Sequence, residues 1–198
     1  MQVTASVQHT WMTFVDGENL TLRGQDLAEQ RGVTLVEGGY FKRDCFVWIP
    51  GRNGRHRFGG SEFMQQRPIR ATFYTGVTGA DALIQEVRQN LKELAFQPQV
   101  FKRIRKDAKA KGVDIALTKD MLSHAFRGNY ETAVLISGDG DYVPLVEEVQ
   151  RLGKRVVLWF FEGDSLNREL KLGADDFVDI TTFFLDAWKN TPHCPIPR

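Results

Sequence analysis

The sequence has 198 residues and a formal net charge of +1, from 26 lysine and arginine residues against 25 aspartate and glutamate residues. Hydrophobic residues make up 42% of the chain and aromatic residues 11%, which is ample material for a core and excludes an intrinsically disordered protein. No apolar run approaches the ~18 residues that a membrane helix needs, so no membrane partner is expected.

Neither a basic start nor an apolar stretch typical of a secretory signal opens the chain, and its two cysteines fit no metal-ligand or redox spacing. We therefore expect a reduced, cytoplasmic protein. The length favours one domain over residues 10–190 rather than two very small ones.

The first half of the chain predicts strands separated by helices. The apolar, β-prone segment 10–15 runs directly into the turn Asp-Gly-Glu-Asn, and a helix is expected to follow it. The apolar spacing over residues 81–96 also indicates a helix. In chain order we expect a strand at 10–15, a helix from Glu18 or Asn19 to about 31, a strand at 44–50, a loop rich in glycine and arginine at 51–60, a strand at 70–75, the helix at 81–96 and a strand at 99–104.

The second half continues this alternation more regularly. It predicts, in chain order, a helix at 113–126, a strand at 132–136, a helix at 142–152, a strand at 155–160, a helix at 166–172, a strand at 177–180 and a helix at 181–189. Three prolines predict a poorly ordered tail at 191–198. Alternating strands and helices favour an α/β fold with a mainly parallel central sheet covered on both faces, and the functional site of such a fold lies beyond the carboxyl ends of its strands.

Aspartates gather at this expected edge of the sheet. Asp16 follows the strand at 10–15, Asp139 and Asp141 follow the strand at 132–136, and Asp114 begins the helix at 113–126. Singly, each has an ordinary explanation as a turn or helix N-terminal residue. Together they would repel one another unless protons or cations neutralise them. Mg²⁺ suits such oxygen ligands, and it can activate water and clamp a phosphoryl oxygen, so the sequence predicts metal-assisted phosphodiester hydrolysis.

Asp120 is a weaker, supporting candidate. It lies six residues after Asp114, about 600° further around a helix, and therefore on a different face.

The near-neutral total charge hides two basic stretches. Residues 41–70 and 102–111 each carry a local balance of +5, which leaves −9 for the rest of the chain. Basic stretches beside clustered carboxylates are typical of a protein that binds a polyanion and binds cations at one site. The alternative is an ordinary solvated loop and helix face, and composition alone does not decide between the two.

Several ordered motifs carry a family resemblance. They comprise Phe-Val-Asp-Gly-Glu-Asn at 14–19, Lys-Gly-Val-Asp-Ile-Ala-Leu at 111–117 with Asp-Met-Leu at 120–122, and Ser-Gly-Asp-Gly-Asp-Tyr at 137–142. Gly-Lys-Arg-Val at 153–156 and the segment 170–177 extend the likeness, which covers roughly residues 10–180. Together they resemble the NYN domain family of the PIN-like nuclease superfamily, and its bacterial LabA-like branch in particular.

The resemblance implies a Rossmann-like PIN fold and Mg²⁺- or Mn²⁺-dependent cleavage of RNA. By motif it implies a metal and catalytic site in which Asp16 and Asp139 hold the ion, with Asp114 and Asp141 binding it directly or through water. It also implies that Asn19 orients water or a phosphate and that Ser137 hydrogen-bonds a ligand carboxylate. The side chains expected to hold the RNA backbone are Arg52, Arg55, Arg57, Lys102, Arg103, Arg105 and Lys111.

Three functional hypotheses follow. The first is a metal-dependent ribonuclease that acts on single-stranded or structured RNA. The second is a catalytically weak RNA-binding or regulatory module on the same fold. The third is a phosphohydrolase with an aspartyl nucleophile, but such enzymes place a second aspartate two residues after the first, where this chain has Glu18. A homo-oligomer is also considered, because the aromatic residues in 183–188 can cover either the chain's own core or a partner.

Overall fold

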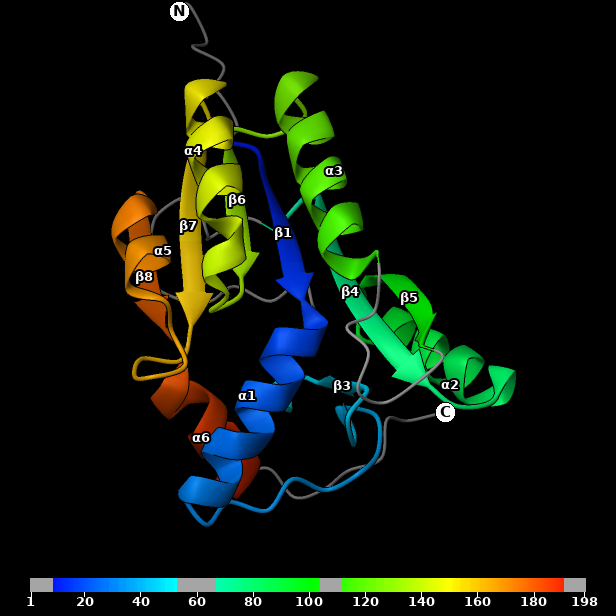
Figure 1. Cartoon of the computed structure of the whole chain (residues 1–198). Helices are drawn as coiled ribbons and strands as arrows, with labels where there is room; N and C mark the ends of the chain where they lie inside the picture. The colour runs from blue at the N-terminus through cyan, green and yellow to red at the C-terminus, as the bar shows by residue number, and fades with distance from the viewer. Residues whose placement is uncertain (1–8, 53–66, 104–111, 191–198) are drawn as a thin grey trace, which may run out of the picture.

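A computed structural model describes residues 9–52, 67–103 and 112–190 (Figure 1). Its centre is a six-stranded sheet with the order β5-β4-β1-β6-β7-β8, and every neighbouring pair of strands is parallel. The strands are β1 (Trp11–Asp16), β4 (Arg70–Thr78), β5 (Gln97–Arg103), β6 (Thr132–Ile136), β7 (Arg155–Phe160) and β8 (Asp176–Asp179). The helices are α1 (Gly17–Gln30), α2 (Asp81–Glu93), α3 (Val113–Phe126), α4 (Val143–Arg151), α5 (Arg168–Gly173) and α6 (Thr181–Asn190), with a 3₁₀ turn η2 (Gly140–Tyr142) before α4.

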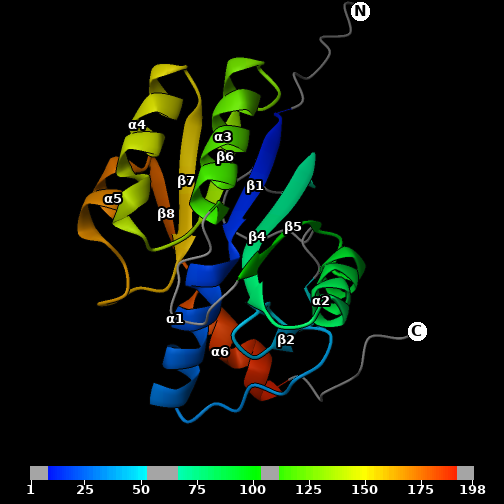
Figure 2. The same ribbon diagram turned by 45° about the vertical axis from the view of Figure 1, so that its right-hand side comes forward.

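Both faces of the sheet are covered, because side chains of the central strands alternate between two apolar clusters. Val15, Ile136 and Trp159 contribute to the cluster shared with α1, α2 and α6, whereas Phe14 and Leu135 contribute to the cluster shared with α3, α4 and α5. Figure 2 shows α3 and α4 on one side of β1 and β4, and α2 on the other. Strands β1 and β6 are buried along their whole length, which explains their continuous apolar sequences. The predicted α/β fold with a covered parallel sheet is confirmed.

The chain reverses its direction of winding at β1. From β1 it builds outward to β4 and β5, and it then returns through α3 to place β6 on the other side of β1. Figure 1 shows the strand arrows pointing toward α1 at the lower end of the sheet. Ligands of open α/β sheets bind at such a switch point, beyond the carboxyl ends of the strands. Here that place lies between the ends of β1 and β6.

The strand predicted at 44–50 is wrong in extent and in partner. Only Phe46–Val47 is a strand (β3), and it pairs antiparallel with β2 (Phe41–Lys42) in a small ribbon outside the main sheet. Residues 45–50 are nevertheless all buried, because they line the core, and the Cys45 carbonyl accepts a hydrogen bond from the Thr75 hydroxyl of β4 (2.6 Å). Burial rather than strand formation explains this apolar run.

The remaining predicted elements that lie in the described ranges are present, with ends shifted by a few residues. The tail at 191–198 and residues 53–60 of the glycine- and arginine-rich loop lie outside the described residues. The aromatic side chains of Phe184 and Trp188 in α6 are buried in the chain's own core. Among the helices of the described ranges, none has the length and apolar character to cross a membrane.

Candidate active site

Asp16 stands at the junction of β1 and α1. It is the last residue of β1 and caps the N-terminus of α1, where its Oδ1 accepts a hydrogen bond from the backbone N–H of Asn19 (3.1 Å). The helix begins at the next residue, Gly17, where a β-carbon would overlap the ring of Phe73. The Asp16 side chain is only 2% exposed. A carboxyl group is thus held in the interior at the carboxyl edge of the sheet.

Hydrogen bonds tie this junction to the loop that follows β6. Val15 is the register partner of Ile136, so the next residues on the two strands, Asp16 and Ser137, lie side by side. The Ser137 hydroxyl donates to Asp16 Oδ2 (2.9 Å) and accepts from the backbone N–H of Asp139 (3.1 Å). The hydrogen bond from Ser137 to a candidate ligand carboxylate is therefore present.

Asn19 makes the second connection between the two loops. Its Oδ1 accepts from the backbone N–H of Gly138 (2.9 Å). The amide oxygen of Asn19 thus holds the loop after β6, and the role of this side chain in orienting water or a phosphate stays a prediction.

The loop after β6 is pressed closely against the connection between β7 and α5. A β-carbon at Gly138 would overlap the ring of Phe160 and would lie 2.5 Å from the Ser165 carbonyl oxygen. The loop is closed by Asp139, whose Oδ1 accepts from the backbone N–H of Asp141 (3.0 Å). Asp139 is half-buried and Asp141 is exposed, so both carboxylates are accessible at the edge of the sheet.

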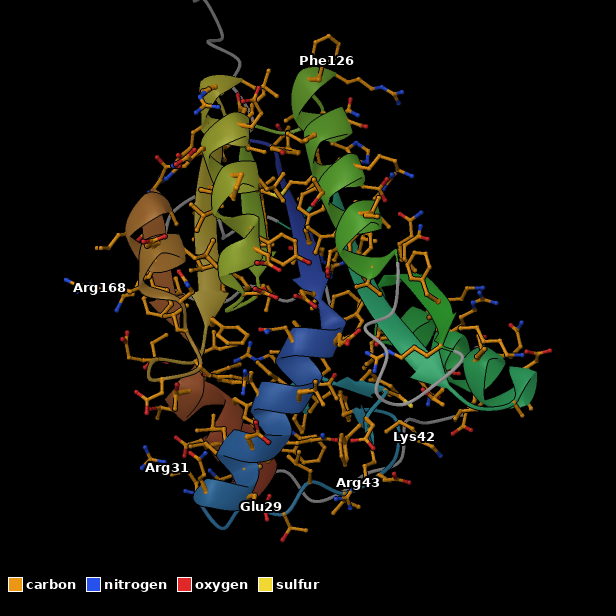
Figure 3. All side chains as sticks on the ribbon, in the orientation of Figure 1. Glu29, Arg31, Lys42, Arg43, Phe126 and Arg168 are labelled. Atoms are coloured by element: carbon orange, nitrogen blue, oxygen red, sulfur yellow. The ribbon has the colours of Figure 1, made fainter. Side chains whose placement is uncertain are left out.

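Asp114 reaches the same edge from α3. This helix starts near the end of β1 and runs back along the sheet to Phe126 (Figure 3). Asp114 is exposed, and its Oδ1 accepts a hydrogen bond from the hydroxyl of Tyr142 (3.3 Å), a residue of η2 that is 2% exposed. Asp114 is thus brought to the edge of the sheet where Asp16 and Asp139 lie.

The electrostatics of the site reflect this proximity. The pKa of Asp16 is raised from 3.8 to about 7, mainly by burial and further by the negative charges of Asp114 and Asp139, while the hydrogen bonds from Asn19 and Ser137 partly oppose the rise. Burial and the charges of the same three aspartates also raise the pKa of the Tyr142 hydroxyl. A cation placed among these groups would favour their charged forms.

The donor chemistry suits a hard divalent cation, although the side chains do not form a finished ligand set. In residues 9–52, 67–103 and 112–190, no three or more His, Cys, Asp and Glu side chains are grouped so that they could hold a metal ion. Mg²⁺ typically binds through one or two carboxylates and keeps several waters, so it needs no such complete group. A buried carboxyl group with two further carboxylates close by fits this kind of ion.

Asp120 has partners that differ from those of Asp114. Its Oδ2 accepts from the hydroxyl of Tyr74 in β4 (3.1 Å), and its Oδ1 lies 3.6 Å from Lys119 Nζ. The predicted difference in helix face between Asp114 and Asp120 is therefore reflected in different tyrosine partners.

The predicted RNA-binding side chains that lie in the described ranges have partners within the chain. Arg103 forms an ion pair with Glu18, Lys102 Nζ lies 2.6 Å from Asp81, and the Arg52 guanidinium lies 4.9 Å from the ring centre of Phe183. The other members of the predicted set, Arg55, Arg57, Arg105 and Lys111, lie outside the described residues. Contact with RNA by any of these seven stays a prediction.

Sequence reasoning missed two side chains at this edge. Tyr142 contacts Asp114, and its only sequence signal is its place directly after the Gly-Asp-Gly-Asp turn. The sequence gives Glu18 no role at the site, and its ion pair with Arg103 joins the start of α1 to the end of β5. Each of these contacts joins two separate elements, so the residue pattern within one element does not predict it.

The order of these elements and the motifs at their ends agree with a known family. The NYN domain profile matches residues 11–181. The chain belongs to the NYN domain family. NYN domains have a PIN-like nuclease fold, and the family is generally nuclease-like.

Comparison with solved structures adds support for the fold of this NYN protein. A protein of unknown function from Vibrio parahaemolyticus has a similar crystal structure, with a TM-score of 0.64 and 22% sequence identity, over 93% of this chain and 99% of that one. At this identity the likeness bears on the fold alone. No curated protein matches the sequence.

Proposed function

We propose that this NYN protein is a divalent-metal-dependent ribonuclease that hydrolyses RNA phosphodiester bonds. The observation that carries the proposal is a buried carboxyl group at the switch point of the sheet, Asp16, whose pKa is raised by burial and by the neighbouring charges of Asp114 and Asp139. Membership of a generally nuclease-like family supports the same chemistry.

In this proposal Asp16 and Asp139 hold Mg²⁺ or Mn²⁺, and Asp114 and Asp141 bind it directly or through water. When bound, the ion supplies an activated water and polarises a phosphoryl oxygen of the substrate. The chain's own groups fix the geometry: the Asn19 N–H and the Ser137 hydroxyl each engage one oxygen of Asp16. The basic stretches at 41–70 and 102–111 hold the RNA backbone.

One observation favours a second candidate, a catalytically weak RNA-binding or regulatory module. The acidic side chains of the described ranges are not already grouped as a metal-binding set. If the carboxylates do not close around a cation, the same basic stretches would still bind RNA without cutting it.

The aspartyl phosphohydrolase is disfavoured. Its nucleophile would be Asp16, and a second aspartate would be expected two residues later. The residue two positions later is Glu18, and its carboxylate is paired with Arg103. The position of the expected second aspartate thus holds a glutamate that is already engaged in an ion pair.

The test is cleavage of labelled single-stranded and hairpin RNA in Mn²⁺ or Mg²⁺. We expect metal-dependent cutting by the wild type, and a loss of more than about 100-fold in the Asp16→Asn/Asp139→Asn double variant and in EDTA. Asp186→Asn is the matched control, because Asp186 is an exposed acid of α6 outside the site, and this variant should cut normally.

Two outcomes would contradict the ribonuclease. Binding of RNA without cleavage, in all metals and with both substrates, would leave the binding module as the function. Cutting that survives the double variant would place the activity elsewhere or in a contaminant.

A further inference from the structure

The hydroxyl of Tyr142 links two parts of the acidic site that are remote in sequence. Its backbone N–H donates to the Asp139 carbonyl (3.2 Å), so the residue is anchored to the loop after β6. Its hydroxyl donates to Asp114 Oδ1 at the start of α3 (3.3 Å). The ring is 2% exposed and packs in the apolar cluster beneath α3 and α4. The donor is therefore held by a rigid core, while its acceptor is on an exposed side chain.

We propose that Tyr142 is a positioning residue that fixes Asp114 beside Asp16 and Asp139 and thereby sets the affinity of the site for a divalent cation. This inference rests on the proposed metal-dependent function. A carboxylate held by one donor keeps its remaining lone pairs for a cation or its waters, and it gives up less rotational freedom when the cation binds. Removing the hydroxyl leaves the Asp114 side chain in place but without the donor that fixes it.

The same apolar cluster contains two tyrosines that serve as comparisons. Tyr130 is fully buried and donates to the Met121 carbonyl (2.9 Å), with no acid involved. Tyr74 is fully buried and donates to Asp120 rather than to Asp114. Phenylalanine at either position removes a buried hydroxyl as it does at Tyr142, so the three variants differ mainly in which acceptor is released.

The experiment measures Mn²⁺ binding to the metal-free protein without RNA, from the electron paramagnetic resonance signal of free Mn²⁺. We expect Tyr142→Phe to weaken Mn²⁺ binding by about 10-fold, the lower end of what loss of a group behind a metal ligand costs. In RNA cleavage, the Mn²⁺ concentration for half-maximal rate should rise by a similar factor, while the rate at saturating Mn²⁺ changes little. Tyr130→Phe and Tyr74→Phe should bind Mn²⁺ like the wild type.

A double-mutant cycle separates positioning from general damage. Asp114→Ala should weaken Mn²⁺ binding at least as much as Tyr142→Phe, and the combined variant should be no weaker than Asp114→Ala alone, because Tyr142 acts through Asp114. If Tyr142→Phe does not fold, Asp114→Ala still decides: unchanged Mn²⁺ affinity in that variant overturns the inference.

The inference also fails if Tyr142→Phe keeps wild-type affinity, or if Tyr130→Phe loses as much. A wild type that binds no Mn²⁺ overturns the proposed metal site itself. If the wild type binds Mn²⁺ and Tyr142→Phe binds it with the same affinity, only the positioning role of Tyr142 is overturned.

Discussion

At the scale of single residues, Asp16 stands out because folding makes its carboxyl group harder to ionise. Its pKa rises from 3.8 to about 7, first through burial and then through the charges of Asp114 and Asp139. Between these two values the folded protein binds a proton that the unfolded chain has released. The free energy of unfolding that Asp16 contributes therefore falls as pH rises from about 4 to about 7, and the loss is complete above that range.

Replacing Asp16 by asparagine should remove this dependence in metal-free protein. We expect Asp16→Asn to be more stable than the wild type at pH 8, by up to a few kcal/mol, and close to it near pH 4, where the wild-type carboxyl is protonated. Urea unfolding in EDTA across this pH range measures the difference. An advantage that is as large at pH 4 as at pH 8 would refute the assignment. Added Mn²⁺ should stabilise the wild type but not the variant.

At the scale of elements, the loop from Ser137 to η2 is held from two sides. Asn19 and Ser137 join it to the start of α1, and Gly138 lets it approach the β7–α5 connection. On the far side, the Asn167 backbone N–H donates to the Gly138 carbonyl (3.0 Å), and the Asn167 side chain caps α5. The position of Asp139 is thus set by contacts with three other elements rather than by the loop itself.

Gly138→Ala tests this close approach. The added methyl group would overlap the Phe160 ring and crowd the Ser165 carbonyl, so we expect a loss of stability of about 1–3 kcal/mol or more, together with lower activity as the loop is displaced. Gly173→Ala is the control, because no atom lies within 4 Å of a β-carbon there and the residue ends α5. Chemical denaturation compares the stability of the two variants. Equal stability would show that the loop can accommodate the added methyl group.

At the scale of the whole molecule, a nearly neutral protein separates its charges into basic stretches and an acidic site. Lys102 and Arg103 at the end of β5 are already paired with Asp81 and Glu18. These pairs have to be weakened or shared if the same side chains contact phosphates. The arginines of the loop at 51–60 are therefore the better test of RNA binding.

Substituting Arg55 and Arg57 together by glutamine should weaken RNA binding and flatten its salt dependence. Each lost phosphate contact should reduce the slope of log affinity against log salt by roughly 0.7–1. The measurement is fluorescence anisotropy with labelled single-stranded RNA in EDTA, between about 50 and 200 mM salt. Lys92→Gln/Lys189→Gln is the control, because it removes the same charge outside both basic stretches. An unchanged slope in the arginine variant would show that these side chains do not contact RNA.

The fold and the position of the acidic edge could be predicted from the sequence because both follow from local patterns. Apolar runs such as 132–136 mark buried parallel strands, and residues just beyond them meet at one edge. The segment 44–50 misled the prediction because a run that lines the core is as apolar as a buried strand. The contacts of Tyr142 with Asp114 and of Glu18 with Arg103 join separate elements, and no pattern within one element reports them.

The central place of β1 has a consequence for the order in which the protein is made. Ser137, which hydrogen-bonds Asp16, follows it by 121 residues, and β6 pairs directly with β1. At roughly 5–20 residues per second, a ribosome needs about 6–24 s to pass from one to the other. During that interval the first strand has been synthesised without one of its two neighbours, and the acidic site is incomplete. The acidic site can therefore assemble only after β6 and the loop that follows it have been translated.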